Sequence, residues 1–119
     1  MAQGRGSATL GGLLAVCLLL GVVAHIADAE THTVDWSFNA DAWSKGKRFR
    51  AGDVLEFNYD RTKHNVVVVD AGGYSTCSSS GRTYNSGSDH ITLGSGTSYF
   101  ICSLKSHCGM GMKMAITAN

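Results

Sequence analysis

Apolar and polar residues alternate in short stretches along most of this chain, a pattern that predicts β-strands. Residues 33–38 read Thr-Val-Asp-Trp-Ser-Phe and residues 54–59 read Val-Leu-Glu-Phe-Asn-Tyr, with apolar side chains at every second position. Residues 66–69 are four valines in a row, which is typical of a strand buried on both faces. The pattern therefore favours several short strands with at least one of them in the centre of the core.

The remainder of the pattern completes an all-β chain. Residues 91–93, 98–102 and 113–117 are expected to be the last strands, and residues 71–90, rich in Gly and Ser, are expected to be mostly loop. A short helical turn is expected at 40–44. Because short strands alternate with Gly, Asn and Asp turns and no helical period persists, the sequence predicts a β-sandwich or barrel.

The first 29 residues have the layout of a secretory signal peptide. Arg5 precedes an apolar run from Leu10 to Ala24, and Ala27-Asp28-Ala29 is a small-residue cleavage pattern ahead of Glu30. The alternative is a membrane anchor, but an apolar run of this length is short for a bilayer span. We therefore expect residues 1–29 to be removed and residues 30–119 to be secreted, without a membrane anchor.

The mature chain, residues 30–119, has the size of one small domain with balanced charge. The full sequence carries 10 Lys and Arg against 9 Asp and Glu, a net charge of +1, and loss of Arg5 and Asp28 with the signal leaves that difference unchanged. This balance does not indicate nucleic-acid binding. The one basic cluster flanks a glycine turn and is expected to be solvated surface; it consists of Lys45, Lys47, Arg48 and Arg50.

Cysteine counting points to an unpaired thiol. Of the four cysteines, Cys17 lies in the predicted signal peptide, which leaves Cys77, Cys102 and Cys108. Secreted proteins tend to pair their cysteines, and three cannot all pair within one chain. The cysteine left over forms an intermolecular disulfide, stays a free thiol or binds a metal. The count alone does not say which two of the three cysteines pair with each other.

Soft donors gather between the last two predicted strands. Cys102, His107 and Met112 follow one another at Cys-x4-His-x4-Met spacing, and Gly109 and Gly111 allow the loop to turn back, so that Met112 returns close to Cys102. A thiolate, an imidazole and a thioether are thus expected at one end of the sheets.

A fourth donor has few candidates. His64 directly precedes the valine strand, whose buried end is a rigid support, and it is the best candidate on physical grounds. His32 and His90 have no assigned role and are expected on the surface.

Two histidines, one cysteine and a weak methionine are the ligand set of a blue-copper electron-transfer site. Zinc is the competing interpretation, since three cysteines and a histidine could close a structural zinc site. The sequence has no Cys-x2-Cys pair, and the expected compartment is oxidising, so copper is favoured.

Beyond these residues, nearly the whole of 33–119 resembles the phytocyanins, a cupredoxin family, and most of all the plantacyanin or basic blue protein group. The stretches that carry the resemblance, in order, are Trp43 to Asp53, Leu55 to Tyr59, His64 to Val69, Gly72 to Cys77, and Tyr99 to Cys102 continuing through His107-Cys108 to Gly111-Met112-Lys113. The resemblance implies a cupredoxin-like Greek-key β-sandwich or barrel with short helical turns.

The resemblance also implies a copper site and a disulfide. It places one copper ion on His64, Cys102, His107 and Met112, and it pairs Cys77 with Cys108. The ligand loop departs from the family pattern: Ser103 to Ser106 replace Asn-Phe-Pro-Gly, and the chain contains no proline. A second methionine, Met110, stands near the axial position; we expect it on the loop surface or filling a gap, and we assign the axial role to Met112.

The function expected from this site is electron transfer rather than enzymatic catalysis. The chain is predicted to be a secreted, monomeric type I copper protein in the apoplast or cell wall, cycling between Cu(II) and Cu(I). By resemblance, His107 is at the exposed edge where a small redox partner could approach. The alternative is an extracellular signalling or wall-associated protein whose copper is structural or incidental.

Other apolar residues, namely Trp36, Trp43, Phe49 and Met114, are expected to pack in the core.

Overall fold

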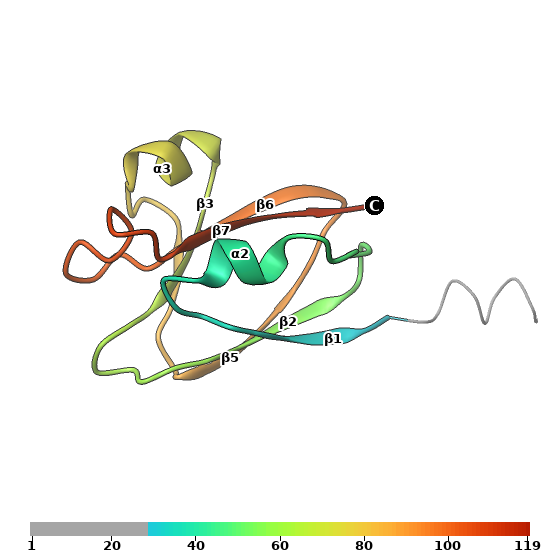
Figure 1. The fold of residues 1–119 in the computed structure, drawn as a ribbon, viewed down its shortest axis with the longest axis horizontal. Helices are drawn as coiled ribbons and strands as arrows, with labels where there is room; N and C mark the ends of the chain where they lie inside the picture. The colour runs from blue at the N-terminus through green and yellow to red at the C-terminus, as the bar shows by residue number, and fades with distance from the viewer. Residues whose placement is uncertain (1–28) are drawn as a thin grey trace, which may run out of the picture.

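The computed structural model describes residues 29–119 and contains two β-sheets and two short helices (Figure 1). The predicted signal peptide lies outside the described residues, except for Ala29, so its removal stays a prediction. Within residues 29–119, no helix is long and apolar enough to cross a membrane.

The smaller sheet has three strands in the order β1-β2-β5. Its strands are β1 (Thr31–Val34), β2 (Val54–Asn58) and β5 (Ser88–Thr92). β1 pairs in parallel with β2, with Thr31 opposite Val54, whereas β5 pairs antiparallel with β2. The buried side chains of β2, Leu55 and Phe57, alternate with more exposed ones, as the sequence pattern predicts.

The larger sheet has four antiparallel strands in the order β4-β3-β6-β7. They are β3 (Val66–Val69), β4 (Arg82–Tyr84), β6 (Gly96–Ile101) and β7 (Lys113–Ala118). The valine run is fully buried only at Val66 and Val67, while Val68 and Val69 are half-buried. The prediction of a strand at 66–69 is confirmed, and its burial on both faces is limited to its first half.

The two sheets face each other across one apolar core. Phe57 of β2 and Phe100 of β6 are fully buried, with ring centroids 5.3 Å apart. Met112, Met114 and Ile116 share a buried face at the final strand, as predicted. The predicted helical turn is helix α2 (Ala40–Ser44), which lies beside β7 (Figure 1).

The packing roles predicted for three aromatic residues are confirmed. Trp36 and Phe49 are buried and Trp43 packs against the same core cluster. The strand expected at residues 33–38 is misplaced: β1 begins at Thr31 and ends at Val34, so it overlaps the predicted range only at residues 33–34. The chain turns there and places the Trp36 indole in the core, where its Nε1 donates to the Asn65 carbonyl oxygen at 2.9 Å.

The prediction that residues 71–90 are mostly loop is wrong. This segment contains helix α3 (Ala71–Thr76), all of β4 and the start of β5. The Asp70 side chain accepts a hydrogen bond from Gly73 N at 2.7 Å and caps α3 at its N-terminus. Glycine and serine lower the strand and helix signals locally, but the cap and the pairing of β4 with β3 determine the structure here.

The assignment of His32 to the surface is also wrong. Its side chain is only 14% exposed, and its Nε2 lies 2.9 Å from Oδ2 of the buried Asp53. The ring also contacts Phe49 edge-on. His90, by contrast, is 54% exposed and lies 3.3 Å from Glu56 on the neighbouring strand, as a surface residue would.

Candidate metal centre

A thiol and two imidazole groups from three separate segments meet at one end of the larger sheet. Cys102 Sγ lies 3.5 Å from His107 Nδ1 and 3.9 Å from His64 Nδ1, and the two Nδ1 atoms are 3.2 Å apart. Cys102 is fully buried, whereas both histidines are partly exposed. The structure thus brings together three of the four residues predicted as ligands through their donor atoms.

His64 is held by the turn that precedes β3. Its backbone N–H donates to the Asp60 carbonyl oxygen at 3.0 Å, and the Asp60 side chain in turn accepts from Thr62 N at 2.9 Å. Burial lowers the pKa of His64, and the nearby His107 lowers it further. The imidazole is therefore neutral at physiological pH, which is the form that binds metals.

The loop between β6 and β7 is closed by backbone hydrogen bonds. Cys102 N donates to the Met112 carbonyl oxygen at 3.0 Å, and Met112 N donates to the His107 carbonyl oxygen at 2.9 Å. The Met112 side chain is fully buried in the same core cluster as Cys102. The predicted return of Met112 to Cys102 is therefore present in the backbone.

Asn65 is a supporting residue that the sequence reasoning missed. Its side chain donates to Ser103 Oγ and accepts from Ser103 N, both at 2.9 Å. Because Asn65 follows His64 and Ser103 follows Cys102, this pair of hydrogen bonds ties the two donor segments together. The available signal was a polar residue between a histidine and a buried valine run, where an amide needs a partner.

The unusual loop sequence has an unusual backbone. Lys105 and Ser106 have φ values of 48° and 61°, in the left-handed region that non-glycine residues rarely adopt. His107 N donates to the Leu104 carbonyl oxygen at 2.9 Å, which closes this turn. Two consecutive left-handed residues thus form the turn that precedes His107.

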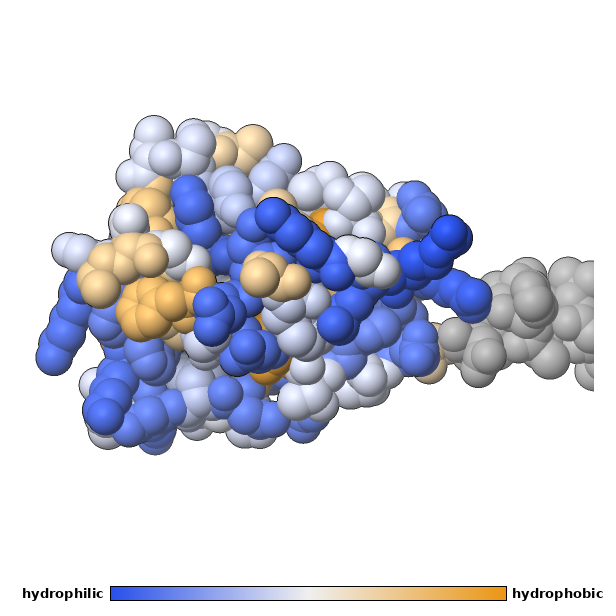
Figure 2. Space-filling view, in the orientation of Figure 1, coloured by the Kyte–Doolittle hydropathy of each residue, from blue (hydrophilic) through white to orange (hydrophobic). Residues whose placement is uncertain are grey.

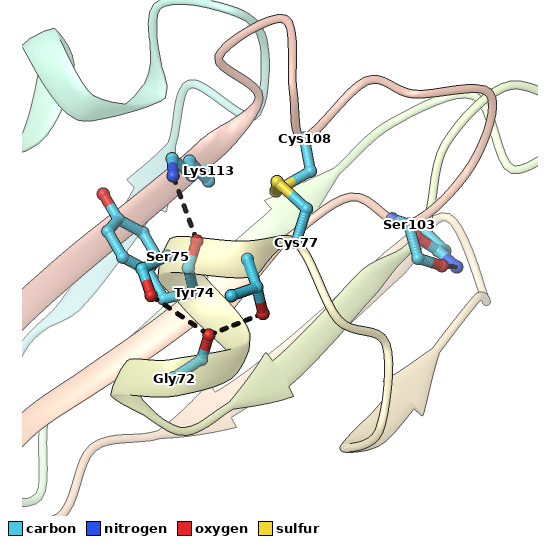
Figure 3. Close-up of a disulfide and its surroundings, with 9 residues drawn as sticks. Gly72, Tyr74, Ser75, Cys77, Ser103, Cys108 and Lys113 are labelled. Atoms are coloured by element: carbon cyan, nitrogen blue, oxygen red, sulfur yellow. Dashed lines mark hydrogen bonds between the residues drawn. A yellow bond between two sulfur atoms is a disulfide. The ribbon is translucent and has the colours of Figure 1, made fainter.

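A disulfide bond joins Cys77 and Cys108, as the resemblance implied (Figure 3). Their Cα atoms are 5.8 Å apart, and Cys102 is the one free cysteine among residues 29–119. The bond links the end of α3 to the residue after His107. Lys113 Nζ, at the start of β7, also donates to the Tyr74 carbonyl oxygen of α3 at 3.0 Å (Figure 3). Helix α3 is therefore linked both to the loop, through the disulfide, and to the strand that follows it.

The donor separations fit a metal ion. Three ligands at about 2.0–2.3 Å from a metal in a trigonal arrangement lie about 3.5 Å from one another, and the three separations observed here cluster around that value. One sulfur and two imidazole nitrogens, with a buried thioether residue beside them, suit copper better than a closed zinc site, which would need a fourth strong donor. The two other cysteines are tied in the disulfide.

An apolar rim borders His107. Phe38 is 44% exposed and its ring meets the His107 ring edge-on, with centroids 5.4 Å apart, and Met110 is 65% exposed. Figure 2 shows apolar surface at the end of the molecule where the β6–β7 loop lies, among mostly hydrophilic surroundings. His107 is therefore bordered by two uncharged side chains, Phe38 and Met110.

The fold and site together define the class of protein. Two facing β-sheets with a cysteine and two histidines at one end form a cupredoxin fold, and the family model of the plastocyanin-like domain matches residues 33–112. The chain belongs to this plastocyanin-like family and, within it, to the phytocyanins.

Individual relatives agree with this placement. The chain is 48% identical to a basic blue protein of Arabidopsis thaliana over 129 aligned positions, which cover 99% of each chain, and 48% identical to a chemocyanin of Lilium longiflorum over 125, again 99% of each. The solved structure of cucumber basic protein, described as a blue copper protein, superposes with a TM-score of 0.72 at 50% identity, covering 75% of this chain and 99% of that one.

Proposed function

We propose that this chain is a secreted one-electron carrier, not an enzyme, that binds one copper ion through His64, Cys102, His107 and Met112. The observation that carries the proposal is the convergence of Cys102 Sγ and the two Nδ1 atoms to within 3.9 Å of one another. Copper held there supplies one-electron chemistry between Cu(II) and Cu(I). Family membership and the similarity to cucumber basic protein, a blue copper protein, support the choice of metal.

The protein's own contribution is a fixed set of donors. The thiol is buried, the Asn65–Ser103 hydrogen bonds connect the two segments that carry His64 and Cys102, and the disulfide fixes the residue after His107. A donor set that keeps its positions needs little rearrangement when the charge on the metal changes. The buried surroundings also exclude water and extra ligands from the thiolate side.

The route for electrons is expected to pass through His107. This imidazole is partly exposed and is bordered by Phe38 and Met110, which offer an uncharged contact surface to a small redox partner. The proposal includes a monomeric protein. The encounter with the redox partner is expected to be brief, since the apolar rim beside His107 consists of few residues. Export to the apoplast or cell wall after removal of residues 1–29 is part of the same proposal.

The direct test is the absorption spectrum of the purified secreted protein after addition of Cu(II). A Cu(II)–thiolate bond gives an intense visible charge-transfer band and a blue colour that a reductant bleaches. Cys102→Ser should remove the colour, and His90→Gln, at an exposed histidine on β5, should keep it.

A folded, metal-loaded protein that stays colourless would contradict the proposal and favour zinc. Circular dichroism of Cys102→Ser, which replaces sulfur with oxygen at a buried position, would verify that the loss of colour is not a loss of fold. A blue protein whose copper cannot be reduced and reoxidised reversibly would point instead to a structural copper in a signalling or wall-associated protein.

A further inference from the structure

A second group of donor atoms lies at the start of β1, at the opposite end of the molecule from the β6–β7 loop (Figure 1). Glu30 N donates to Asp53 Oδ1 at 3.0 Å, and His32 Nε2 lies 2.9 Å from Asp53 Oδ2. The side-chain donor atoms of Glu30, His32 and Asp53 lie within 4.8 Å of one another. Sequence reasoning assigned no role to any of these residues.

Asp53 is the centre of this group. It is 1% exposed, and its two carboxylate oxygens accept hydrogen bonds from Glu30 N, His32 Nε2 and Arg50 N at 2.9–3.0 Å. A carboxylate has about four lone-pair positions, and the three donors occupy three of them. A cation held between the Glu30 nitrogen, His32 and the carboxylate would take the place of two of these hydrogen bonds and offset the negative charge of the carboxylate.

Solvent can reach this group from one side. Glu30 is exposed and the His32 side chain is partly so, whereas Asp53 lies beneath them.

Cleavage after Ala29 changes the chemistry of the Glu30 nitrogen. In the precursor it is a peptide N–H, which does not bind metal ions without losing its proton. In the mature chain it is a primary α-amine, which binds metal ions through its lone pair once it loses a proton, and His32 becomes the third residue. An amine and an imidazole, two residues apart, then converge on one carboxylate.

We propose that the mature N-terminus is a second copper site, which binds Cu(II) through the Glu30 α-amine, the His32 imidazole and the Asp53 carboxylate. Nitrogen and oxygen donors in a tetragonal arrangement suit Cu(II), which also binds such sites more tightly than the other divalent first-row metals. Binding breaks the hydrogen bond between His32 Nε2 and Asp53, the imidazole keeps its single proton on Nδ1, and one proton of the ammonium group is released to solvent. The inference rests on the cleavage after Ala29 in the proposed function, and it does not depend on the thiolate centre.

The experiment uses secreted protein whose N-terminal residue is identified by mass spectrometry. Protein already loaded with one copper is given a further equivalent of Cu(II) and desalted, and its copper content and electron paramagnetic resonance spectrum are recorded. We expect two copper ions per chain and a second, tetragonal component with a wider parallel hyperfine splitting than the thiolate-bound copper.

The matched control retains Ala29 as the first residue. Every side chain is preserved, but the Glu30 nitrogen is again a peptide amide and His32 is the fourth residue, so the chain should keep one copper after desalting. His32→Gln should also keep one, with second-site affinity reduced at least tenfold, and His90→Gln should keep two. Cys102→Ser should lose the blue component and retain the tetragonal one.

Three results would overturn the inference. These are a secreted chain that does not begin at Glu30, a second copper that the Ala29-retaining chain binds equally tightly, and a copper content of one in the mature chain. If the folded Asp53→Asn protein binds the second copper ion with unchanged affinity, the Asp53 carboxylate is not one of its ligands. A mature chain that never turns blue but shows the tetragonal signal would contradict the proposed electron carrier and support the N-terminal site.

Discussion

The backbone N–H of Cys102 donates to the carbonyl oxygen of Met112 at 3.0 Å. This hydrogen bond fixes the start of β7 against the end of β6, so the position of the Met112 side chain is set by the sheet and not by a bond to metal. Met110, two residues earlier, is 65% exposed between two glycines. The two methionines of the loop therefore have opposite environments.

The first prediction compares these two methionines. Met112→Leu should keep the blue colour, because the cysteine and both histidines are unchanged, and should raise the reduction potential, because a donor that favours Cu(II) is lost. Met110→Leu should leave the potential nearly unchanged. Voltammetry of the two variants measures the effect, and a larger shift for Met110→Leu would show that the axial donor is Met110.

The second prediction concerns the Cys77–Cys108 disulfide. Replacing both cysteines with alanine should destabilise the metal-free protein by about 3–4 kcal/mol, because the bond closes a loop between residues 31 positions apart. Denaturant titration measures the loss. In the unaltered protein, alkylation under denaturing, non-reducing conditions should label Cys102 alone; a crosslinked peptide containing Cys102 would contradict the assignment.

The third prediction concerns stability in acid. The folded-state pKa of Asp53 lies below the unfolded value, so its contribution to stability is complete above about pH 4 and is lost as the pH falls through the folded-state pKa. Asp53→Asn should cost about 2 kcal/mol at pH 7, because the amide cannot accept from all three donors. The difference from the unaltered protein should shrink below about pH 4.

Urea titration at several pH values between 2 and 7 checks this prediction. Asp60→Asn is the matched control: Asp60 also has a lowered pKa, through hydrogen bonds from Thr62, but it is fully exposed. Its replacement should leave the pH profile close to that of the unaltered protein. A constant difference between Asp53→Asn and the unaltered protein at all pH values would contradict the ionised state of Asp53.

The fourth prediction tests the packing of β4 against β3. A Cβ atom at Gly81 would overlap the Val68 carbonyl oxygen, which is backbone and cannot move aside, so Gly81→Ala should destabilise the protein by about 1–3 kcal/mol. At Gly94 a Cβ atom meets nothing within 4 Å. Gly94→Ala should therefore be neutral or slightly stabilising, and thermal unfolding of the two variants should show opposite or clearly unequal shifts.

The sequence is informative where the pattern is strong. It predicts the strand at Val66–Val69 and the helical turn at Ala40–Ser44 with their correct bounds, because valines and a bounded polar turn give local signals. The loop geometry around Cys102 and Met112 follows from two glycines and the spacing of the donors. These are features that neighbouring residues determine by themselves.

The sequence pattern does not predict structure that depends on contacts with other parts of the chain. Helix α3 depends on the Asp70 cap and the disulfide partner Cys108, and neither is visible as a helical period. The role of Asn65 requires Ser103, and the burial of His32 requires Asp53 near the neighbouring strand. Apart from the Asp70 cap, which joins residues three positions apart, these contacts join residues more than 20 positions apart, so no local pattern contains them.

The disulfide has a consequence for the order in which the protein matures. Cys108 follows His107 directly, so the sulfur–sulfur bond ties the backbone that presents this imidazole covalently to the end of α3. Lys105 and Ser106 adopt left-handed φ values that are unfavourable for non-glycine residues, so the turn before His107 depends on support from other contacts. We therefore expect oxidative folding to precede metal acquisition: a chain that is still reduced inside the cell would hold copper loosely, and the tight site would be completed only along the export route.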